Sequence, residues 1–396
     1  MRLGIFIAAA LASLSGLADT AASGNSSQVV QTGNANLVQT NQQNDQNSQI
    51  TVTQTGNGNS AGTAGGNVGI DQQGNQQAQA SVQQLGDQNQ VSIEQSSGSN
   101  INANTLQMGA QNIASISQTA QSYNYQSSIQ QNGNGNIASI DAATVANTGA
   151  PIALNWANDT IDQAGNNNLA TVQQSVTLDS GFTVFQRGDN NNASITQNSQ
   201  VDGTVNTAEV AQSGAGNNAT INQSGNSATT ASIHQGMVGL TPAYNAFSSS
   251  ATIAQAGNVQ STASIDQQAV VASVASIIQN DSLLSTAQIT QNGTNQDGAI
   301  NQTGVANSSA VINQTGSAQI ATINQSGGSW LTANIAQTGS GDVATITQSG
   351  TSNAAYITQN GLGGPNNVAT ISQAASNYIA TVNQNGAGNV ANVSQH

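Results

Sequence analysis

The sequence predicts an all-β fold: a stacked β-solenoid of strand-turn-strand rungs, with a cross-β geometry that is competent to form amyloid. Three observations lead to this prediction: an eleven-residue repeat, a two-residue alternation inside it, and Gly or Asn at its end. The repeat reads Asn-x-Ala-x-(Ile/Val)-x-Gln-x-Gly-x-x and continues to Gln395, with Gln337, Gln348 and Gln359 as successive copies. Tandem units bury their faces only against neighbouring units, so function is expected in the stack and its ends.

The alternation predicts a strand in each repeat. In residues 217–223, Asn217, Ala219, Ile221 and Gln223 fall on every second position and therefore share one side of a strand. A helical period would not keep these residues together. The inward apolar positions predict a thin core, represented by Ala219, Ile221, Ala344, Ile346, Ala355, Ile357, Ala391 and Val393.

The segment after each Gln predicts a tight reversal of the chain. Gly accepts a positive φ and Asn tolerates it, as in Gly386 and Asn389 of the last reversal. Two strand-plus-turn halves make a rung of about 22 residues, whose two strands face each other. Rungs then stack at roughly 4.7–4.9 Å, and on the order of 16 rungs are expected.

Inward Gln and Asn are expected to form ladders along the stack. A buried amide that stands alone loses its water partners, whereas a stacked amide can bond to the same residue type one rung away. The predicted ladder residues are Gln84, Gln95, Gln107, Gln118, Gln163, Gln174, Gln186, Gln197, Gln212, Gln223, Gln291, Gln302, Gln337, Gln348, Gln359, Gln373, Gln384 and Gln395, with Asn217, Asn353 and Asn389 at the strand starts.

The charge balance excludes several partners. The net charge is −14 and the basic residues are Arg2 and Arg187, so binding to nucleic acid or to anionic lipid is not expected. The chain has no Cys and therefore no disulfide scaffold. Outward acidic residues are expected to be diluted along the stack, because like charges on adjacent rungs repel; Asp71, Glu94, Asp162 and Asp266 hold such positions.

The chain divides into a leader and an array. Met1-Arg2, an apolar run from Leu3 and small residues that offer cleavage after Ala18 or Ala22 predict a secretory signal peptide, taken as 1–22. Residues 23–396 form the repeat array. Interruptions are expected near 141–158 and 236–249, and an atypical copy near 175–185.

The side-chain inventory does not predict an enzyme. His234 and His396 are the only histidines, Lys and Cys are missing, and nothing places an activated nucleophile beside a carboxylate. An interior filled by stacked side chains also leaves no cleft for a small-molecule substrate. We therefore predict no catalytic residues, no cofactor and no metal.

The repeat Asn-x-Ala-x-Ile-x-Gln-x-Gly-x-x-Asn resembles the curlin repeat of bacterial curli subunits, over nearly all of residues 27–396. Its inward residues match Ala344, Ile346 and Gln348, and its opening Asn matches Asn353. The resemblance implies a secreted subunit of extracellular amyloid fibres in a biofilm matrix at the cell surface. It also implies export through an outer-membrane channel and a nucleator subunit as a further partner.

Two functions from different classes fit the sequence. The first is a structural subunit that polymerises with itself, because no charged or Pro-rich cap covers the last repeat and the end rungs would leave backbone groups unpaired. The second is a monomeric binding module whose polar face binds ice or polysaccharide. The outward pair Thr345 and Thr347 is of the kind that an ice-binding face would use.

Overall fold

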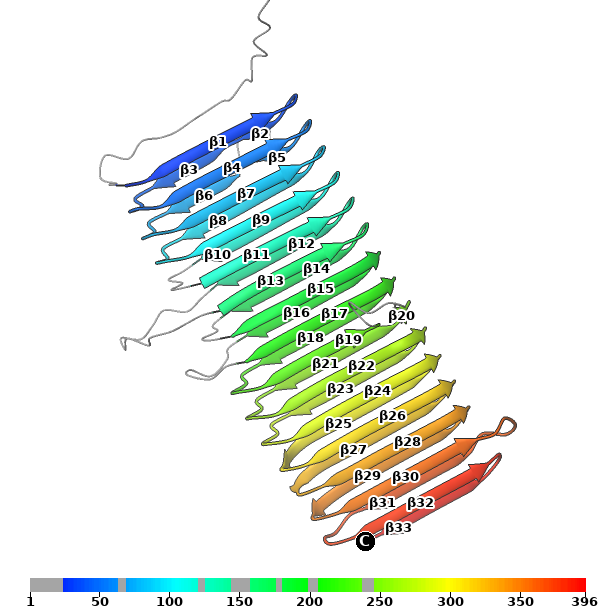
Figure 1. Cartoon of the computed structure of the whole chain (residues 1–396). Helices are drawn as coiled ribbons and strands as arrows, with labels where there is room; N and C mark the ends of the chain where they lie inside the picture. The colour runs from blue at the N-terminus through cyan, green and yellow to red at the C-terminus, as the bar shows by residue number, and fades with distance from the viewer. Residues whose placement is uncertain are drawn as a thin grey trace, which may run out of the picture. The chain divides into compact units, whose positions relative to one another are not determined.

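The structure is a computed structural model that describes residues 24–62, 69–119, 125–143, 157–175, 180–198, 206–236 and 246–396 of the 396-residue chain. The described residues form parallel strands in stacked coils, and the predicted β-solenoid is confirmed (Figure 1). The expected signal peptide at 1–22 lies outside the described residues. The same holds for most of the interruptions at 141–158 and 236–249 and for part of 175–185, so these boundaries remain predictions.

The chain divides into two compact units, Met1–Asn167 and Asn168–His396. In unit 1, six strands form sheet A: β1 Ser26–Thr32, β4 Gln49–Thr55, β7 Gln79–Leu85, β9 Asn102–Met108, β11 Tyr125–Asn132 and β13 Ala157–Ala164. The strands of its sheet B are β2 Leu37–Val38, β3 Thr40–Gln43, β5 Ser60–Ala61, β6 Ile70–Gln73, β8 Gln90–Ser96, β10 Ile113–Thr119 and β12 Ile137–Ala143.

Unit 2 repeats this arrangement with more strands. Its sheet A contains β15 Gly181–Asp189, β17 Thr207–Ala215, β19 Thr230–Gln235, β22 Thr262–Val271, β24 Thr286–Thr294, β26 Ser309–Ser317, β28 Thr332–Ser340, β30 Ala354–Gly361 and β32 Ile379–Gly386, with the short β20 Ala246–Phe247 beside β17 and β22. Its sheet B contains β14 Leu169–Ser175, β16 Asn192–Asn198, β18 Asn218–Ser224, β21 Ser250–Ala256, β23 Val274–Asn280, β25 Asp297–Ala306, β27 Ile320–Ser329, β29 Val343–Thr351, β31 Val368–Gln373 and β33 Val390–Gln395.

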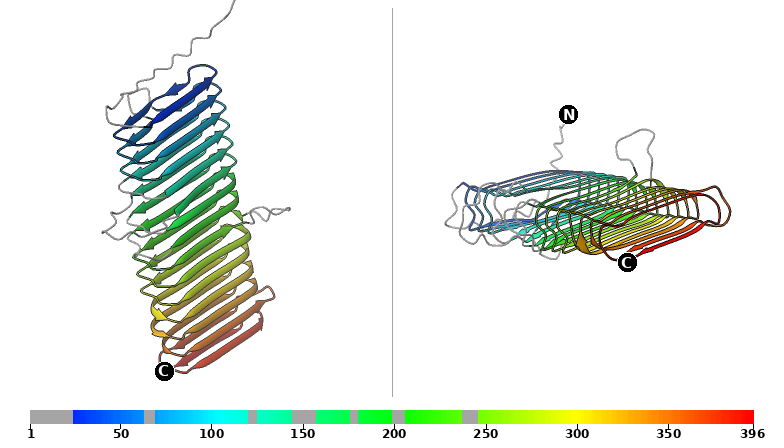
Figure 2. Two further views of the ribbon diagram at one scale, coloured as in Figure 1. Left: turned by 60° about the vertical axis from the view of Figure 1, so that its left-hand side comes forward. Right: turned by 90° about the horizontal axis from the view of Figure 1, so that it is seen from below.

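In each unit the chain passes alternately through the two sheets, which lie as two layers (Figure 2). Each strand pairs in parallel with the strands one rung before and after it, and equivalent repeat positions meet. Ala344, for example, pairs with Ala321 and with Ala369. Stacked turn glycines allow the close approach of rungs: Gly316 has a φ of 129°, and a Cβ there would meet the carbonyl of Gly339. The two-residue alternation therefore sets the face of every side chain.

The core is as thin as the repeat predicts. Ala219, Ile221, Ala344, Ile346, Ala355 and Ile357 are all fully buried between the two layers. Ala391 and Val393 are only half-buried, because their strand β33 has a described neighbour on one side alone, β31. Among the described residues, no helical segment has the length and apolar composition of a membrane span.

Two expectations need correction. Rungs are longer than 22 residues in most places, because the turns vary: equivalent ladder glutamines are 22 residues apart at Gln337 and Gln359 but 32 apart at Gln131 and Gln163. Fewer than the expected 16 rungs therefore form. The acidic residues are also not separated by uncharged rungs everywhere, since Asp71 and Glu94 are direct register partners on β6 and β8.

Candidate functional site

Buried glutamines form continuous ladders in unit 2. In sheet A, the Nε2 atom of each glutamine donates to the Oε1 atom of the next, at 2.7–3.1 Å, through Gln186, Gln212, Gln235, Gln267, Gln291, Gln314, Gln337, Gln359 and Gln384. In sheet B the series at 2.7–2.9 Å is Gln174, Gln197, Gln223, Gln255, Gln279, Gln302, Gln325, Gln348, Gln373 and Gln395.

Many of the ladder amides also reach across the core. Gln337 Nε2 donates to the Ile320 carbonyl at 3.0 Å, and Gln348 Nε2 donates to the Thr332 carbonyl at 3.0 Å. Both N–H groups of such an amide are therefore used, one along the stack and one between the sheets. The ladder satisfies the buried amides and ties the two layers together.

Unit 1 holds two shorter ladders of the same kind. Sheet A carries Gln31, Gln54, Gln84, Gln107, Gln131 and Gln163, and sheet B carries Gln42, Gln72, Gln95 and Gln118. On the next rung of sheet B, the register partner of Gln118 is Ala142, so no side-chain amide is there to accept a hydrogen bond from Gln118. Gln118 Nε2 instead donates to Ser127 Oγ at 2.9 Å, and Ser127 stands where the facing strand would hold a core Ala.

The three asparagines of the predicted ladder differ. Asn217 Nδ2 donates to Asn191 Oδ1 at 3.1 Å, and Asn389 Nδ2 donates to Asn367 Oδ1 at 3.0 Å. Asn353 is buried but joins no amide ladder, so the prediction that it is a ladder residue was wrong. Its Oδ1 accepts the backbone N–H of Tyr378 at 2.9 Å, because the next rung offers Tyr378 at that corner and no amide.

All glutamine ladders have the same direction, which makes the two ends chemically different. Among the described residues, no donor reaches Oε1 of Gln31 or Gln42, on β1 and β3. At β32 and β33, Gln384 Nε2 bonds to the Val368 carbonyl, and no described acceptor of a further rung faces it or Gln395. One terminal rung therefore presents acceptors and the other presents donors.

The two terminal rungs also match in spacing. Gln31, Asn36 and Gln42 occur at the same intervals as Gln384, Asn389 and Gln395, with Gly33 and Gly386 at equivalent turn positions. Within the chain, Asn36 Oδ1 accepts the backbone N–H of Asn59 at 3.0 Å, one rung on. Asn389 Oδ1 points the same way and has no such donor among the described residues. The end rungs are therefore complementary in both register and hydrogen bonding.

Sequence reasoning missed the two buried carboxylates that occupy turn positions. Asp342 is fully buried in the column of opening asparagines, where it accepts from Gly361 N at 3.1 Å and from Asn367 Nδ2 at 2.9 Å. Asp45 is also fully buried, and its Oδ1 accepts from Asn75 N at 2.6 Å. Its Oδ2 has no partner, and burial raises the pKa of this carboxyl. The substitution of Asn by Asp in the repeat was the available signal for Asp342.

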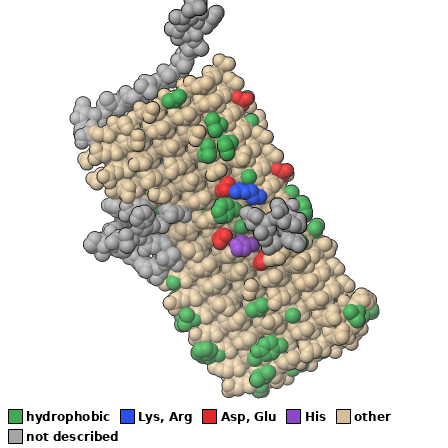
Figure 3. Space-filling view, viewed as in Figure 1, with side chains coloured by type: hydrophobic (Ala, Val, Ile, Leu, Met, Phe, Trp, Pro, Cys, Tyr) green, Lys and Arg blue, Asp and Glu red, His purple; other side chains and the backbone are tan. Residues whose placement is uncertain are grey.

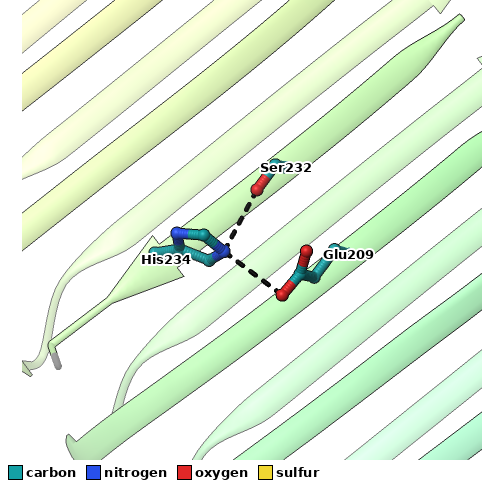
Figure 4. A network of polar contacts seen from close by, with 3 residues as sticks. All are labelled: Glu209, Ser232 and His234. Atoms are coloured by element: carbon teal, nitrogen blue, oxygen red, sulfur yellow. Dashed lines mark hydrogen bonds and ion pairs between the residues drawn. The ribbon is translucent and has the colours of Figure 1, made fainter. Parts of the chain in front are cut away.

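His234 lies on the surface of sheet A. His234 Nε2 lies 3.4 Å from Glu209 Oε1 and 3.2 Å from Ser232 Oγ, on the outer face of sheet A (Figure 4). Both ionisable side chains are more than two-fifths exposed, at 42% and 49%. This arrangement can form a solvated ion pair when the imidazole is protonated. It lacks the enclosure that a catalytic pair needs.

Charged side chains are sparse on the face shown in Figure 3, where uncharged side chains and backbone predominate. In the described part of the chain, no three His, Cys, Asp or Glu side chains are grouped so that they could hold a metal ion.

Comparison with known proteins agrees with the repeat. No curated protein matches the sequence. Residues 331–361, which span β28 and β30 with β29 between them, match the curlin associated repeat. The matched segment includes the ladder residues Gln337, Gln348 and Gln359, whose geometry recurs through both units. The chain therefore contains a curlin associated repeat at residues 331–361, in agreement with the resemblance of its repeats to the curlin repeat.

Proposed function

We propose that this protein is a secreted structural subunit that assembles with itself, end to end, into curli-like extracellular amyloid fibres that serve biofilm matrix and surface adhesion. The observation that carries the proposal is the complementarity of the terminal rungs. In the joint, β32 and β33 of one copy stack on β1 and β3 of the next, so that Gln384 and Gln395 donate to Gln31 and Gln42.

The open strand edges at the C-terminal rung favour end-to-end stacking of copies. Ile379 and Val390, which begin β32 and β33, are 72% and 78% exposed, and the backbone of each strand lacks a further described partner. A second copy would cover these side chains and pair the backbone groups. Export through an outer-membrane channel and initiation by a nucleator subunit belong to the same proposal, and they rest on the family resemblance.

The alternative, an ice- or polysaccharide-binding face, has less support. On sheet B, Thr322, Thr345 and Thr370 form one regular column of hydroxyls. The neighbouring column around Thr347 mixes Asn324 and Ser372. A two-column threonine lattice is therefore not formed over these rungs.

A pair of charge-matched variants tests the joint. In the double variant Gln384→Glu and Gln395→Glu, the new carboxylates still accept the bonds from Gln359 and Gln373, at 2.7 and 2.8 Å, and lose the bonds that the amides donate across the core to the carbonyls of Val368 and Ile379. They cannot donate to the next copy, and they face its acceptor oxygens. Circular dichroism of the soluble variant checks that the chain still folds. Seeded elongation, followed with an amyloid dye, should fall by at least about tenfold, since each joint loses two hydrogen bonds and gains repulsion.

The control variant places the same charges outward, as Asn383→Asp and Ser394→Asp on the same two strands. It should elongate close to the wild-type rate. Equal elongation of the two variants would show that copies do not join at these rungs. Wild-type protein that stays monomeric after prolonged incubation with seeds would reject the fibre function itself.

A further inference from the structure

The corner of unit 2 where sheet B strands turn toward sheet A carries exposed apolar side chains on three of four consecutive rungs, and the remaining rung holds the half-buried Ala306. The turns concerned are those that follow β21, β23, β25 and β27 (Figure 1). Val259 is 40% exposed, Leu283 42%, Leu284 48% and Trp330 61%. Val259 pairs with Leu283, Leu283 with Ala306, and Ala306 with Ser329, which precedes Trp330. The four side chains therefore lie along one edge of the stack, with Ala306 between Leu283 and Trp330, and this edge is here called the corner strip.

The backbone at this corner shows that the two largest side chains are not required by the fold. In rung after rung the corner residue is left-handed, with φ of 50° at Asn307, 58° at Trp330 and 59° at Ser352. Asn suits this conformation, whereas bulky residues disfavour it. Leu284, with φ of 49°, and Trp330 occupy it all the same, and neither gains burial within the chain.

We propose that the corner strip is a lateral contact between copies of this chain, which pairs fibres side by side; this inference rests on the proposed fibre function. A two-fold axis between the Leu283 rung and the Ala306 rung sets Trp330 of one copy against Val259 of the other. The same axis sets Leu283 and Leu284 against Ala306. Large side chains then meet small ones on both sides, as an isologous contact requires.

Charge also favours a second copy as the occupant. Residues 246–395 contain no Lys, Arg or His, so the corner strip offers no cation to a nucleic acid or an anionic lipid. The acidic residue in these turns is Asp281, two residues before Leu283. The contact has to gain its free energy from apolar burial.

The size of the strip fits a contact that acts between fibres. Its four side chains expose on the order of 400 Å² per copy, about half of the roughly 800 Å² that each partner buries in a standard stable complex. One contact is therefore too small to hold two free copies together. In a stack, every copy adds one contact, and the contacts act together.

The test compares fibres of two variants with those of the wild type. The double variant Leu284→Asn and Trp330→Asn removes the large apolar groups, and Asn suits the left-handed corner, so folding is preserved. The control Leu362→Asn removes a side chain that is 71% exposed in the turn after β30, at the other corner of the rung. Electron microscopy counts single and laterally paired fibres, and dye binding measures elongation.

The double variant should elongate like the wild type and lower the fraction of paired fibres by at least about tenfold, while Leu362→Asn leaves pairing unchanged. Pairing that persists in the double variant would overturn the lateral contact and leave the fibre function standing. Equal loss of pairing in Leu362→Asn would overturn it as well. Failure of the wild type to form fibres would reject the fibre function and this contact with it.

Discussion

Replacing Gln348 by Ala perturbs the ladder at a well-defined point. Gln348 is fully buried on β29. Its Oε1 accepts from Gln325 Nε2 at 2.9 Å, and its Nε2 donates to Gln373 Oε1 at 2.8 Å and to the Thr332 carbonyl at 3.0 Å. The substitution therefore breaks three hydrogen bonds and leaves groups on both neighbouring rungs without a partner.

The size of the effect follows from these orphaned groups. An N–H of Gln325 and the Oε1 of Gln373 would remain buried and unpaired, each at a cost of about 1–3 kcal/mol, so the predicted loss of stability is about 2–6 kcal/mol before any cavity term. Gln348→Leu fills the space but orphans the same groups, so it should stay close to Gln348→Ala. Thr347→Ala, one position away on the outer face, should change stability by at most about 0.5 kcal/mol.

The assay is the concentration of soluble chain left when assembly reaches steady state, with the guanidinium midpoint for fibre dissolution as a second readout. A loss of about 2 kcal/mol raises the soluble concentration about 30-fold, because about 1.4 kcal/mol corresponds to a factor of ten. Equal values for Gln348→Ala and Thr347→Ala would refute the ladder argument. The same contrast is expected between two triple Ala variants, one of Gln337, Gln348 and Gln359 and one of Thr345, Thr347 and Thr358.

Three further predictions follow from single positions. Burial raises the pKa of Asp45 above its ordinary 3.8, so the contribution of this group to the stability of unit 1 should be fully present below that pH and be lost as the pH rises through the folded-state pKa. In pH-dependent denaturation, Asp45→Asn should abolish this contribution, and Asp71→Asn should only weaken it, because the charge of Asp71 is a minor cause of the raised pKa. Gly316→Ala should lower the denaturation midpoint strongly, because the new Cβ meets backbone, whereas Gly304→Ala at a φ of 60° meets open space and should cost only about 1–2 kcal/mol. Ser127→Ala should lower the free energy of unfolding by about 1–3 kcal/mol in urea denaturation, because it leaves the Gln118 amide, which donates to Ser127 Oγ, without this partner. An unchanged denaturation midpoint would contradict the view that Ser127 replaces the missing ladder acceptor.

The repeat predicted the faces of the strands and the ladders because a two-residue alternation leaves no freedom once one face is buried. Ala344, Ile346 and Gln348 show this directly, since every second residue is fully buried. The family match at 331–361 agrees with the resemblance drawn from those residues. Which residues of a strand face the core depends only on the local alternation of apolar and polar residues, so the sequence alone is enough to predict it.

What the sequence did not predict depends on turn length. Asp71 and Glu94 become register partners because their neighbours Gln72 and Gln95 are consecutive in one ladder, 23 residues apart, so the full length of the rung between them decides which acidic positions meet. The corner strip has the same origin: Val259 and Leu283 lie in five-residue turns that the repeat does not specify. A turn can gain residues without disturbing the ladder, so its length carries no periodic signal.

X-ray fibre diffraction from the purified, assembled protein tests the central claim most directly, namely that copies extend the stack of rungs from one chain to the next. The account predicts a strong meridional reflection near 4.7–4.8 Å with an equatorial reflection near 10 Å from the two packed layers. Ordered fibres whose meridional pattern lacks that reflection would contradict it.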